Sequence, residues 1–398
     1  MQDDPTIPRN LSQTMKEVAG YYPVVTITGP RQSGKTTLCR QTFPDKAYVS
    51  LEPLDVQASA RRDPRGFLAA LSDGAILDEA HNVPELFSYL HEEVDRDSRP
   101  GRFVVTGSRH LGLTESVTQS LAGRTAMLQL MPPSYDELQR FRAPPTSLFE
   151  VLWTGAYPRI HHKGIPAARF LADYLTTYVQ RDVRQLKQIG DLASFTTFLQ
   201  LCASRTGQLL NLSALGADSG ITHNTAKAWL SVLEAGYLVV RLPPWHSSPS
   251  KRLLKTPKLH FLDSGLACNL LGIRSPEELR LHHARGAVFE SWVVSELYKR
   301  SWHRGFEPRL AHYRDQQRLE VDLVLDLSAR LLLVEMKSGA TVAKDFTDAL
   351  DRLAALVARR GEKRPVVRRL VFGGIEAPPS SHATLVPWAK IHDLSWEE

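Results

Sequence analysis

A phosphate-binding loop near the N-terminus constrains the fold of this chain more than any other feature of its 398 residues. Val24–Thr28 is a run rich in β-branched residues, which is typical of a strand. It leads directly into Gly29–Thr36, which matches the pattern GxxxxGK followed by Ser or Thr, and Thr37–Arg40 can continue as a helix. A strand, a glycine-rich loop and a helix in this order predict an α/β domain that holds the phosphates of a nucleotide.

The residue types in this loop explain how it would hold phosphates. Gly29 and Gly34 let the backbone curl so that its N–H groups face phosphate oxygens, and the positive end of the helix dipole adds to the attraction. Lys35 can reach the β- and γ-phosphates, and the Thr36 hydroxyl can ligate Mg²⁺. We therefore predict that ATP and Mg²⁺ bind here, with the nucleotide held by Gly29, Pro30, Arg31, Gln32, Ser33, Gly34, Lys35, Thr36 and Thr37.

A second apolar strand, Ala75–Glu79, ends in two carboxylates. We expect Asp78 to hold Mg²⁺ through water and Glu79 to polarise the attacking water as a general base. Ala80 and His81 complete the letters DEAH. The other signals of DEAH-type helicases are not visible, so we interpret these letters as a coincidence.

A third strand, Arg102–Thr106, is followed by a candidate sensor of the γ-phosphate, with Ser108 the first choice and Thr106 the alternative. Further along, Arg124 ends a short helical stretch that begins at Ser120. An arginine directed at the γ-phosphate of a neighbouring subunit would stabilise transition-state charge, which is worth ~10³–10⁵ in rate. A surface ion pair is the alternative role for Arg124.

These segments together resemble the AAA-type ATPases of a widespread prokaryotic group, in which the ATPase carries a C-terminal domain of unknown function. The resemblance rests on GPRQSGKTT, ILDEAH, VVTGSRH and SLAGRT, and it runs on through GAYPR (155–159) to EVDLVL (320–325). It therefore covers nearly the whole chain. The resemblance implies that Arg124 is an arginine finger and that the subunits form a homo-oligomeric ring, which is usually hexameric in AAA-type proteins.

Three domains are expected. The ATPase core would span residues 1–145, because Pro144 and Pro145 mark a joint. Residues 146–260 would hold a helical lid or connector and a winged-helix module, and residues 261–398 the C-terminal domain. Within the connector, Arg159 or Arg181 could contact the nucleotide, but we favour the interpretation that both are ordinary ion-pair partners.

The clearest interaction module spans residues 195–245. Helices are predicted at Phe195–Ala203, Leu212–Ser219 and Thr222–Leu233, and a returning strand at Ala235–Val240. This order is that of a helix-turn-helix with a wing, in which the third helix can enter the major groove of DNA. Protein docking is the alternative use of such a module.

The third predicted helix has an apolar side and a polar side. The apolar side consists of Ala226, Trp229, Leu230 and Leu233, and the outward residues are His223, Asn224 and Lys227. A single cation is too few for tight DNA binding. The nearby Lys251, Arg252 and Lys255 could supply the missing phosphate contacts.

Acids and a lysine in the C-terminal part match a nuclease core. Gly286–Arg300 predicts a helix that carries Glu290, a strand is expected to end at Asp322, and Leu331–Lys337 predicts a further strand. Asp322, Glu335 and Lys337 then stand as in the PD-(D/E)xK nuclease fold, where two acids bind Mg²⁺ and the lysine stabilises the transition state or activates water.

The C-terminal part is therefore predicted to be a mixed α/β, restriction-endonuclease-like domain. It would hold a second Mg²⁺ at Asp322 and Glu335, with Lys337 and Glu290 beside it. The alternative is a buried Glu–Lys pair in a retained but inactive fold, because a strand interior is an expensive place for these side chains unless they pair or bind metal.

Composition narrows the setting and the partners. The net charge of +6, with a pI near 9.2, is compatible with a nucleic-acid partner. Cys39, Cys202 and Cys268 are far apart and fit a reducing compartment. No segment approaches the roughly 20 apolar residues of a membrane helix, and the polar N-terminus is not a signal peptide. We expect a cytoplasmic protein without a membrane partner.

The leading hypothesis from the sequence is an ATP-hydrolysing AAA-type motor that acts on DNA as an oligomeric ring, by translocation, helicase or branch-migration activity. One alternative is a nucleotide switch that binds or regulates protein partners. Another is an ATP-dependent DNA nuclease.

Overall fold

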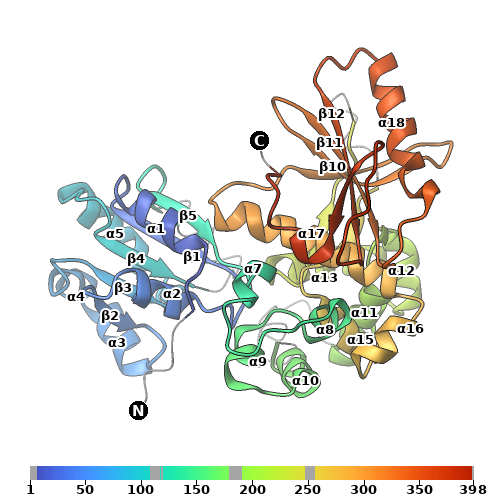
Figure 1. Ribbon diagram of the computed structural model, residues 1–398. Coiled ribbons are helices and arrows are strands. Elements are labelled where there is room, and N and C mark those ends of the chain that lie inside the picture. Colours follow the sequence, from blue (N-terminus) through green and yellow to red (C-terminus); the bar gives the residue numbers. More distant parts are fainter. Residues whose placement is uncertain (1–6, 108–116, 118–119, 179–190, 247–255, 397–398) are drawn as a thin grey trace.

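The computed structural model describes residues 7–396 except 108–116, 118–119, 179–190 and 247–255. An N-terminal domain lies beside a larger body that contains the middle and C-terminal segments (Figure 1). The chain passes from one to the other through the short helix α7 (Tyr135–Leu138). Helix α17 (Arg285–His303) reaches back from the larger body toward the N-terminal domain. Ser108 and Arg181 lie outside the described residues.

The N-terminal domain is built on a parallel sheet with the strand order β2-β3-β4-β1-β5. Its strands are β1 (Val24–Thr28), β2 (Ala47–Ser50), β3 (Ala75–Asp78), β4 (Phe103–Thr106) and β5 (Thr125–Gln129). The three strands expected from the sequence are confirmed to within one residue. Because β1, β3 and β4 are parallel neighbours, the loop after β1 and the acids that end β3 meet at one edge of the sheet.

Helices cover both faces of this sheet. Since successive residues of a strand point to opposite sides, Val25 and Ile27 pack with α1 (Leu11–Ala19) and α2 (Lys35–Thr42). On the other face, Val24 and Leu77 pack with α3 (Leu54–Arg62), α4 (Pro64–Ala69) and α5 (Leu86–Arg96). Both faces of the sheet are therefore buried, as a parallel sheet requires.

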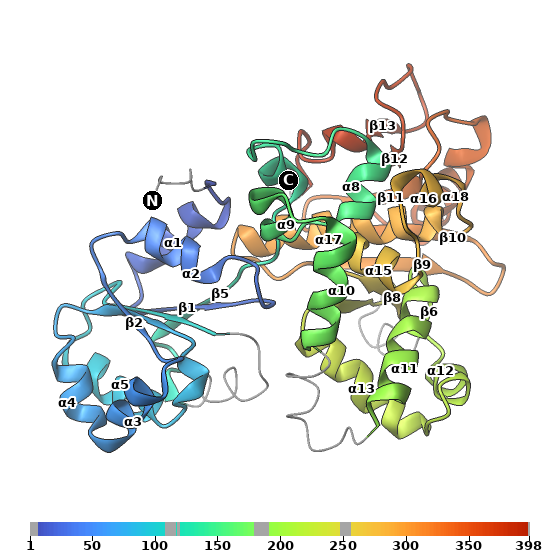
Figure 2. The ribbon, with the colours of Figure 1, turned by 90° about the horizontal axis from the view of Figure 1, so that it is seen from below.

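The middle segment begins with the connector helices α8 (Leu148–Thr154), α9 (Pro158–Lys163) and α10 (Ala167–Tyr178). A second unit follows, in the chain order α11 (Leu192–Ser204), β6 (Gln208–Leu209), α12 (Leu212–Asp218), α13 (His223–Ala235), β7 (Val239–Leu242) and β8 (Lys258–Phe261). Its strands form an antiparallel sheet of order β6-β8-β7. Figure 2 shows the helices of this unit grouped on the side away from the C-terminal sheet.

The three helices predicted for this unit are confirmed, as is the capping role of Thr222, whose side chain accepts a hydrogen bond from the Thr225 N–H. The strand predicted at Ala235–Val240 is wrong in its first half. Helix α13 continues to Ala235, and Tyr237 takes a positive φ of 58° that turns the chain. Strand β7 therefore begins only at Val239.

The C-terminal sheet is mixed, with the strand order β13-β12-β11-β10-β9. Its strands β9 (Leu310–Arg314), β10 (Glu320–Asp326) and β11 (Leu331–Lys337) are antiparallel, whereas β12 (Val366–Phe372) and β13 (Thr384–Pro387) run parallel to β11. Three helices precede these strands, α15 (Ser264–Leu270), α16 (Pro276–Leu281) and α17, and α18 (Asp348–Arg359) connects β11 to β12. None of the helices in the described part of the chain has the length and apolar character needed to cross a membrane.

One prediction for this sheet is corrected. The strand expected to end at Asp322 continues to Asp326, so Asp322 lies near its beginning. Four residues then form the hairpin to β11, whose pairing places Leu323 opposite Val334. Asp322 is thereby close to Glu335 across the two strands, and its Oδ2 accepts the Met336 N–H at 2.9 Å.

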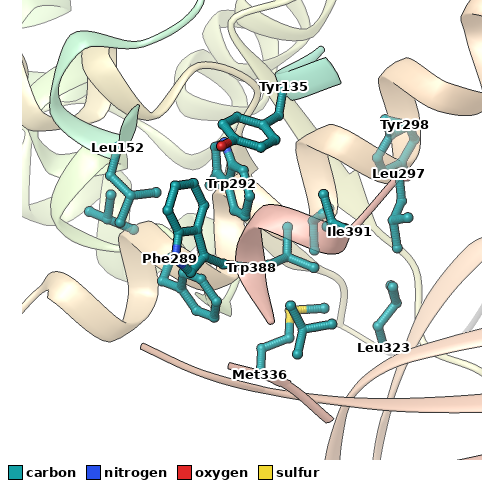
Figure 3. Close-up of a cluster of buried hydrophobic side chains, with 14 of the residues drawn as sticks. Tyr135, Leu152, Phe289, Trp292, Leu297, Tyr298, Leu323, Met336, Trp388 and Ile391 are labelled. Carbon is teal, nitrogen blue, oxygen red and sulfur yellow. The ribbon is translucent and has the colours of Figure 1, made fainter. Parts of the chain in front are cut away.

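A hydrophobic core joins α7 to the C-terminal domain. Figure 3 shows Tyr135 of α7 directed at Trp292 of α17 and at Trp388, which follows β13. The ring centroids lie 6.1 Å and 5.1 Å from that of Tyr135, respectively. Each such aromatic side chain stabilises the fold by roughly 1.5–3 kcal/mol when buried. The exit from the N-terminal domain is thus anchored in the core of the larger body.

Candidate functional site

The predicted phosphate loop lies between β1 and α2. Gly29 and Gly34 have positive φ values of 150° and 96°. A Cβ on Gly29 would lie 2.1 Å from the Leu130 carbonyl oxygen, so only glycine fits there. Helix α2 begins at Lys35, directly after Gly34, and its free N–H groups face the loop. The Lys35 ammonium donates to the carbonyl oxygens of Gly29 and Pro30 at 3.0 Å and 2.8 Å.

The Asp78 carboxylate, at the end of β3, is surrounded by hydroxyl groups from α2, β2 and β4. The Thr36 hydroxyl lies 3.0 Å from both Asp78 carboxylate oxygens, and the Tyr48 hydroxyl donates to Oδ2 at 2.8 Å. The Thr106 hydroxyl donates to Oδ1. A carboxylate and hydroxyls without nitrogen or sulfur suit Mg²⁺. The residues predicted to hold Mg²⁺, Thr36 and Asp78, are therefore in direct contact.

Glu79 follows Asp78 in a left-handed conformation, with φ 53°. Its N–H donates to the Thr106 hydroxyl at 3.3 Å, and its carboxylate lies 3.1 Å from Nδ1 of His81. Burial by itself would raise the pKa of Glu79, but the His81 hydrogen bond and the nearby Lys35 lower it to about 2. The carboxylate is therefore ionised at neutral pH. The histidine of the DEAH letters thus orients Glu79, a role that the sequence analysis did not assign to it.

A cavity of about 580 Å³ opens over this loop. Lys35, Thr36 and Glu79 line it on the side of the phosphate loop. The rest of the lining comes from the N-terminal segment, the residues before and after α7, and the connector: Ile7, Pro133, Phe141, Arg159 and Tyr174. Burial lowers the pKa of Lys35 to about 8, so the ammonium is charged at pH 7. Arg159, which we interpreted as an ion-pair partner, lines this cavity.

Arg9 holds the phosphate loop and lines the same cavity, a role that could not be recognised in the sequence. Its guanidinium donates to the carbonyl oxygens of Ser33 at 2.9 Å and Met131 at 2.7 Å, and its Nε lies 3.1 Å from Glu137. The side chain is only 7% exposed. A single arginine between Pro8 and Asn10 carries no local signal for this role, because all its partners are distant in sequence.

Arg124 lies at the opposite end of the sheet from the phosphate loop. It directly precedes β5, whose first residue, Thr125, pairs with Val24 at the start of β1. The five residues of β1 separate it from the loop by roughly 15 Å. Its Nη2 lies 2.8 Å from Asp95 on the surface. Arg124 therefore does not reach the nucleotide site of its own chain.

A buried polar network fastens α17 to the segment that leaves the N-terminal domain. Glu296 accepts the Tyr135 N–H at 2.6 Å, and Lys299 donates to the Pro133 carbonyl oxygen at 3.1 Å. His303 accepts the Met131 N–H on Nε2 at 3.2 Å, and its Nδ1 lies 3.4 Å from Glu137. Glu137 also holds Arg9. The network therefore links the end of α17 to the phosphate loop through two side chains.

The acids predicted to bind a second Mg²⁺ lie together, and lysines pair with them. We call Glu290, Glu320, Asp322 and Glu335 the acid cluster. Lys258 of β8 lies 2.8 Å from Glu290, 2.7 Å from Glu320 and 3.7 Å from Asp322. Lys337 forms an ion pair with Glu335.

This arrangement does not fit the second Mg²⁺ predicted at Asp322 and Glu335. The Lys258 ammonium lies among Glu290, Glu320 and Asp322, and Lys337 pairs with Glu335. One Asp322 oxygen accepts the Met336 N–H. Within the described ranges no three His, Cys, Asp or Glu side chains are arranged to hold a metal ion. The buried Glu–Lys alternative describes the geometry better. Lys258, the central residue, was not singled out for this site from the sequence.

Comparison with protein families divides the chain into three segments. Residues 21–139 match the AAA domain family. Residues 145–277 and 285–387 match two domains of unknown function, DUF8612 and DUF4143. The first segment contains every residue of the phosphate loop and both acids that follow β3.

Two mycobacterial relatives are similar over most of the chain. Uncharacterized protein Rv2008c of Mycobacterium tuberculosis and uncharacterized protein Mb2031c of Mycobacterium bovis are each 31% identical over 351 residues, which cover 86% of this chain and 77% of the relative. Among solved structures, the Walker-type ATPase PABY2304 of Pyrococcus abyssi matches with a TM-score of 0.47 and 15% identity over 68% of this chain and 97% of that one. DnaA from Aquifex aeolicus matches with a TM-score of 0.29 and 12% identity over 56% and 85%.

The family match and the geometry of the loop agree on the N-terminal domain. The parallel sheet, the glycine loop and the acids at the carboxyl edge lie within the matched segment. The chain belongs to the same family as the mycobacterial protein Rv2008c, and its N-terminal part is an AAA-type P-loop ATPase domain.

Proposed function

We propose that this chain hydrolyses ATP in the cavity above the phosphate loop and uses the hydrolysis to act on DNA as part of an oligomeric ring. The observation that carries the first part is the meeting of Lys35, Thr36 and Glu79 at a cavity of about 580 Å³, with Asp78 bonded to Thr36. These are the groups that phosphoryl transfer requires, because catalysis of this reaction is mainly positioning and charge stabilisation.

Each of these side chains has a defined task in the proposed reaction. The Lys35 ammonium leaves the Gly29 and Pro30 carbonyl oxygens and binds the β- and γ-phosphates. Glu79 accepts a hydrogen bond from the attacking water and orients it, with His81 fixing the carboxylate. Thr36 and Asp78 would hold Mg²⁺, which would supply positive charge beside the phosphates.

Of the two sensor candidates, Thr106 is the one that lies within the described residues. Its hydroxyl contacts both Asp78 and the Glu79 N–H, so it links the metal-binding acid to the water-orienting acid. The opposite wall of the cavity supplies apolar and aromatic side chains for the nucleoside, including Phe141 and Tyr174. Arg159 on the same wall supplies a cation for the phosphates. The connector would therefore sense which nucleotide is bound.

The middle unit supports DNA as the partner. Its order of helix, strand, two helices and a two-stranded hairpin is the order of a winged helix, and α13 occupies the place of the helix that enters the major groove. Ala226, Trp229, Leu230 and Leu233 are buried, as predicted, while His223, Asn224 and Lys227 are exposed at the start of α13. Lys251, Arg252 and Lys255, proposed as phosphate contacts, lie outside the described residues.

A ring is supported by the position of Arg124. An arginine at the amino end of β5 is far from its own phosphate loop and is exposed enough, at 34%, to reach a neighbouring subunit. Such a residue can contribute to hydrolysis only across an interface. The proposal of an arginine finger and the proposal of a ring therefore stand or fall together.

One observation favours the nucleotide switch as a second candidate. The buried network from Arg9 through Glu137 to His303 connects the phosphate loop to the C-terminal domain without passing through the middle unit. A switch that signals to a partner bound by the C-terminal domain would need such a connection. The nuclease alternative has no such support, because lysines pair with the acid cluster.

The decisive experiment is ATP turnover with single-stranded, duplex and four-way-junction DNA. The proposal predicts that at least one of these raises turnover and that added salt weakens binding steeply, because counterions are released from the phosphates. Unchanged turnover together with unchanged electrophoretic mobility of every DNA would refute the DNA part and favour the switch. Lys35→Ala serves as the blank in each assay.

A further inference from the structure

The Lys258 side chain is buried among acids that come from a different part of the molecule. Only 2% of it is exposed, although lysine is rarely buried without partners. It belongs to β8 in the sheet of the middle unit, whereas Glu290 lies on α17 and Glu320 and Asp322 on β10. Each contact therefore bridges the middle unit and the C-terminal domain.

The surroundings of Lys258 hold the acid cluster in this paired state. Arg314 lies 3.3 Å from the second oxygen of Glu320, and Lys337 pairs with Glu335. His260, two residues beyond Lys258 on the same side of β8, is fully buried, and its Nε2 lies 3.8 Å from Glu290. A lysine, an arginine and a second lysine thus face four carboxyl groups, so most of the cluster's charge is compensated within the chain.

The segment that leads from β7 to Lys258 is fixed at both of its ends to the same domain. At its beginning, the Trp245 N–H donates to the His312 carbonyl oxygen at 2.6 Å, and the His312 N–H donates to the Pro243 carbonyl oxygen at 2.9 Å. The Trp245 indole N–H donates to Asp326 at 2.9 Å. At its end, the His312 ring lies 3.2 Å from the Thr256 carbonyl oxygen. Both ends of the β7–β8 connection are therefore held against β9 and β10.

We infer that Lys258 takes the place of a metal ion in the acid cluster, so that the cluster joins the middle unit to the C-terminal domain and binds no divalent cation. An ammonium group suits this place because its N–H donors lie within hydrogen-bond distance of Glu290 and Glu320, and its positive charge lies 3.7 Å from Asp322. The acids that the sequence predicted for a nuclease site here receive a lysine instead. This inference does not depend on the proposed function.

The test is a Mn²⁺ titration of the nucleotide-free full chain. Electron paramagnetic resonance measures the binding, because the signal of free Mn²⁺ is lost when the ion is bound. The wild-type chain and Asp322→Asn are expected to bind the same amount of Mn²⁺. Lys258→Ala removes the internal cation and leaves the acids, and it is expected to bind Mn²⁺ at least about tenfold more tightly than wild type, by about 1.4 kcal/mol. Adding Asp322→Asn to Lys258→Ala should abolish the new site.

Lys344→Ala is the matched control, since Lys344 is an exposed lysine of the same domain and its removal should leave Mn²⁺ binding at the wild-type level. If Lys258→Ala fails to fold, Lys258→Met keeps the volume of the side chain and takes its place. The inference would be overturned if the wild-type chain bound Mn²⁺ at a site that is lost in Asp322→Asn. A folded Lys258 variant that binds no more Mn²⁺ than wild type would overturn it too. Because no ATP is present, failure here leaves the ATPase proposal untouched.

Discussion

The ATP site and the acid cluster contain the same kinds of side chain in different states. At the ATP site, Lys35 is bonded to carbonyl oxygens of its own loop, Glu79 borders a cavity, and Asp78 is bonded to the Thr36 hydroxyl. In the acid cluster, Lys258 and Lys337 are bonded to the carboxylates themselves. A lysine that is bonded to neutral backbone carbonyl oxygens can exchange these for phosphate oxygens. A lysine that is bonded to carboxylates is already neutralised by an ion pair.

The difference shows that residue type alone does not make a ligand site. Burial raises the pKa of Glu290 and of Glu335, and the nearby Asp322 adds to the effect in both. By contrast, Glu79 has its pKa lowered to about 2, since His81 and Lys35 outweigh its burial. One site keeps an ionised carboxylate beside a cavity. In the other, burial and Asp322 shift Glu290 and Glu335 toward their protonated forms despite their lysine partners.

The largest expected effect concerns Arg124, which would complete the ATP site across an interface. Arg124→Ala should lower ATP turnover by about 10³–10⁵ and leave ATP binding intact, because only transition-state charge loses its partner. Steady-state turnover and fluorescent-nucleotide binding measure the two effects. Mixing Arg124→Ala with Lys35→Ala should restore part of the turnover, since each subunit supplies what the other lacks. Unchanged turnover of Arg124→Ala would reduce this residue to a surface partner of Asp95.

Glu79 gives the next largest effect. Glu79→Gln keeps the size of the side chain but removes the carboxylate that orients the water, so turnover should fall by about 10²–10⁴ while ATP stays bound. The matched change in the acid cluster is Glu335→Gln, which should leave turnover near wild type. Equal losses in both variants would erase the functional difference between the two sites.

For the free energy of unfolding, a change in the acid cluster should have a larger effect than a change in the ATP site. Lys258→Ala leaves carboxylates buried without their cation and should lower the free energy of unfolding by about 3–5 kcal/mol in the absence of divalent cations. Lys35→Ala removes hydrogen bonds to two carbonyl oxygens and should cost only about 1 kcal/mol. Urea unfolding of the two variants beside wild type measures this. The distinction between the ATP site and the acid cluster would be contradicted if Lys35→Ala lost more unfolding free energy than Lys258→Ala.

The smallest predicted effect is a pH dependence at the junction between the two sites. Burial, with the nearby charges of Arg9 and Lys299, lowers the pKa of His303 from its usual 6.5 to about 4. The neutral ring accepts the Met131 N–H on Nε2. A group whose folded pKa is depressed contributes stability above its unfolded pKa. That stability is lost as the pH falls from about 6.5 toward 4, up to about 3 kcal/mol.

The matched variant is His303→Gln, which cannot titrate. Its free energy of unfolding should fall less steeply over the same pH interval than that of wild type. Identical slopes in the two proteins would mean that His303 is not the group that responds. Urea midpoints at pH 7, 6, 5 and 4 are sufficient for the comparison.

Much of the ATP site was predictable from the sequence because its parts are local. The loop is one continuous segment after a β-branched strand, and Asp78 and Glu79 end a strand of similar character. The helices α11, α12 and α13 were predictable because their capping residues and apolar spacing are local too. The strand predicted at Ala235–Val240 failed since Tyr237 adopts a turn conformation that its residue type does not favour.

The contacts that distinguish the two sites were not predictable, because they join distant segments. Arg9 contacts the carbonyl oxygen of Met131, 122 positions away, and Lys258 reaches Glu290 across 32 positions. Asp322, Glu335 and Lys337 could be placed on neighbouring strands from the sequence. The entry of a lysine from another sheet between the acids could not be predicted, since no local pattern marks Lys258 as buried.

The most direct test of this account measures ATP turnover of the wild type, Lys35→Ala and Lys337→Ala in parallel. Both variants remove one lysine that lies beside an acidic pair. The account predicts that Lys35→Ala abolishes turnover, whereas Lys337→Ala stays within about twofold of wild type, as a partly exposed lysine away from the nucleotide should. Turnover that survives in Lys35→Ala, or that is lost in Lys337→Ala, would contradict it.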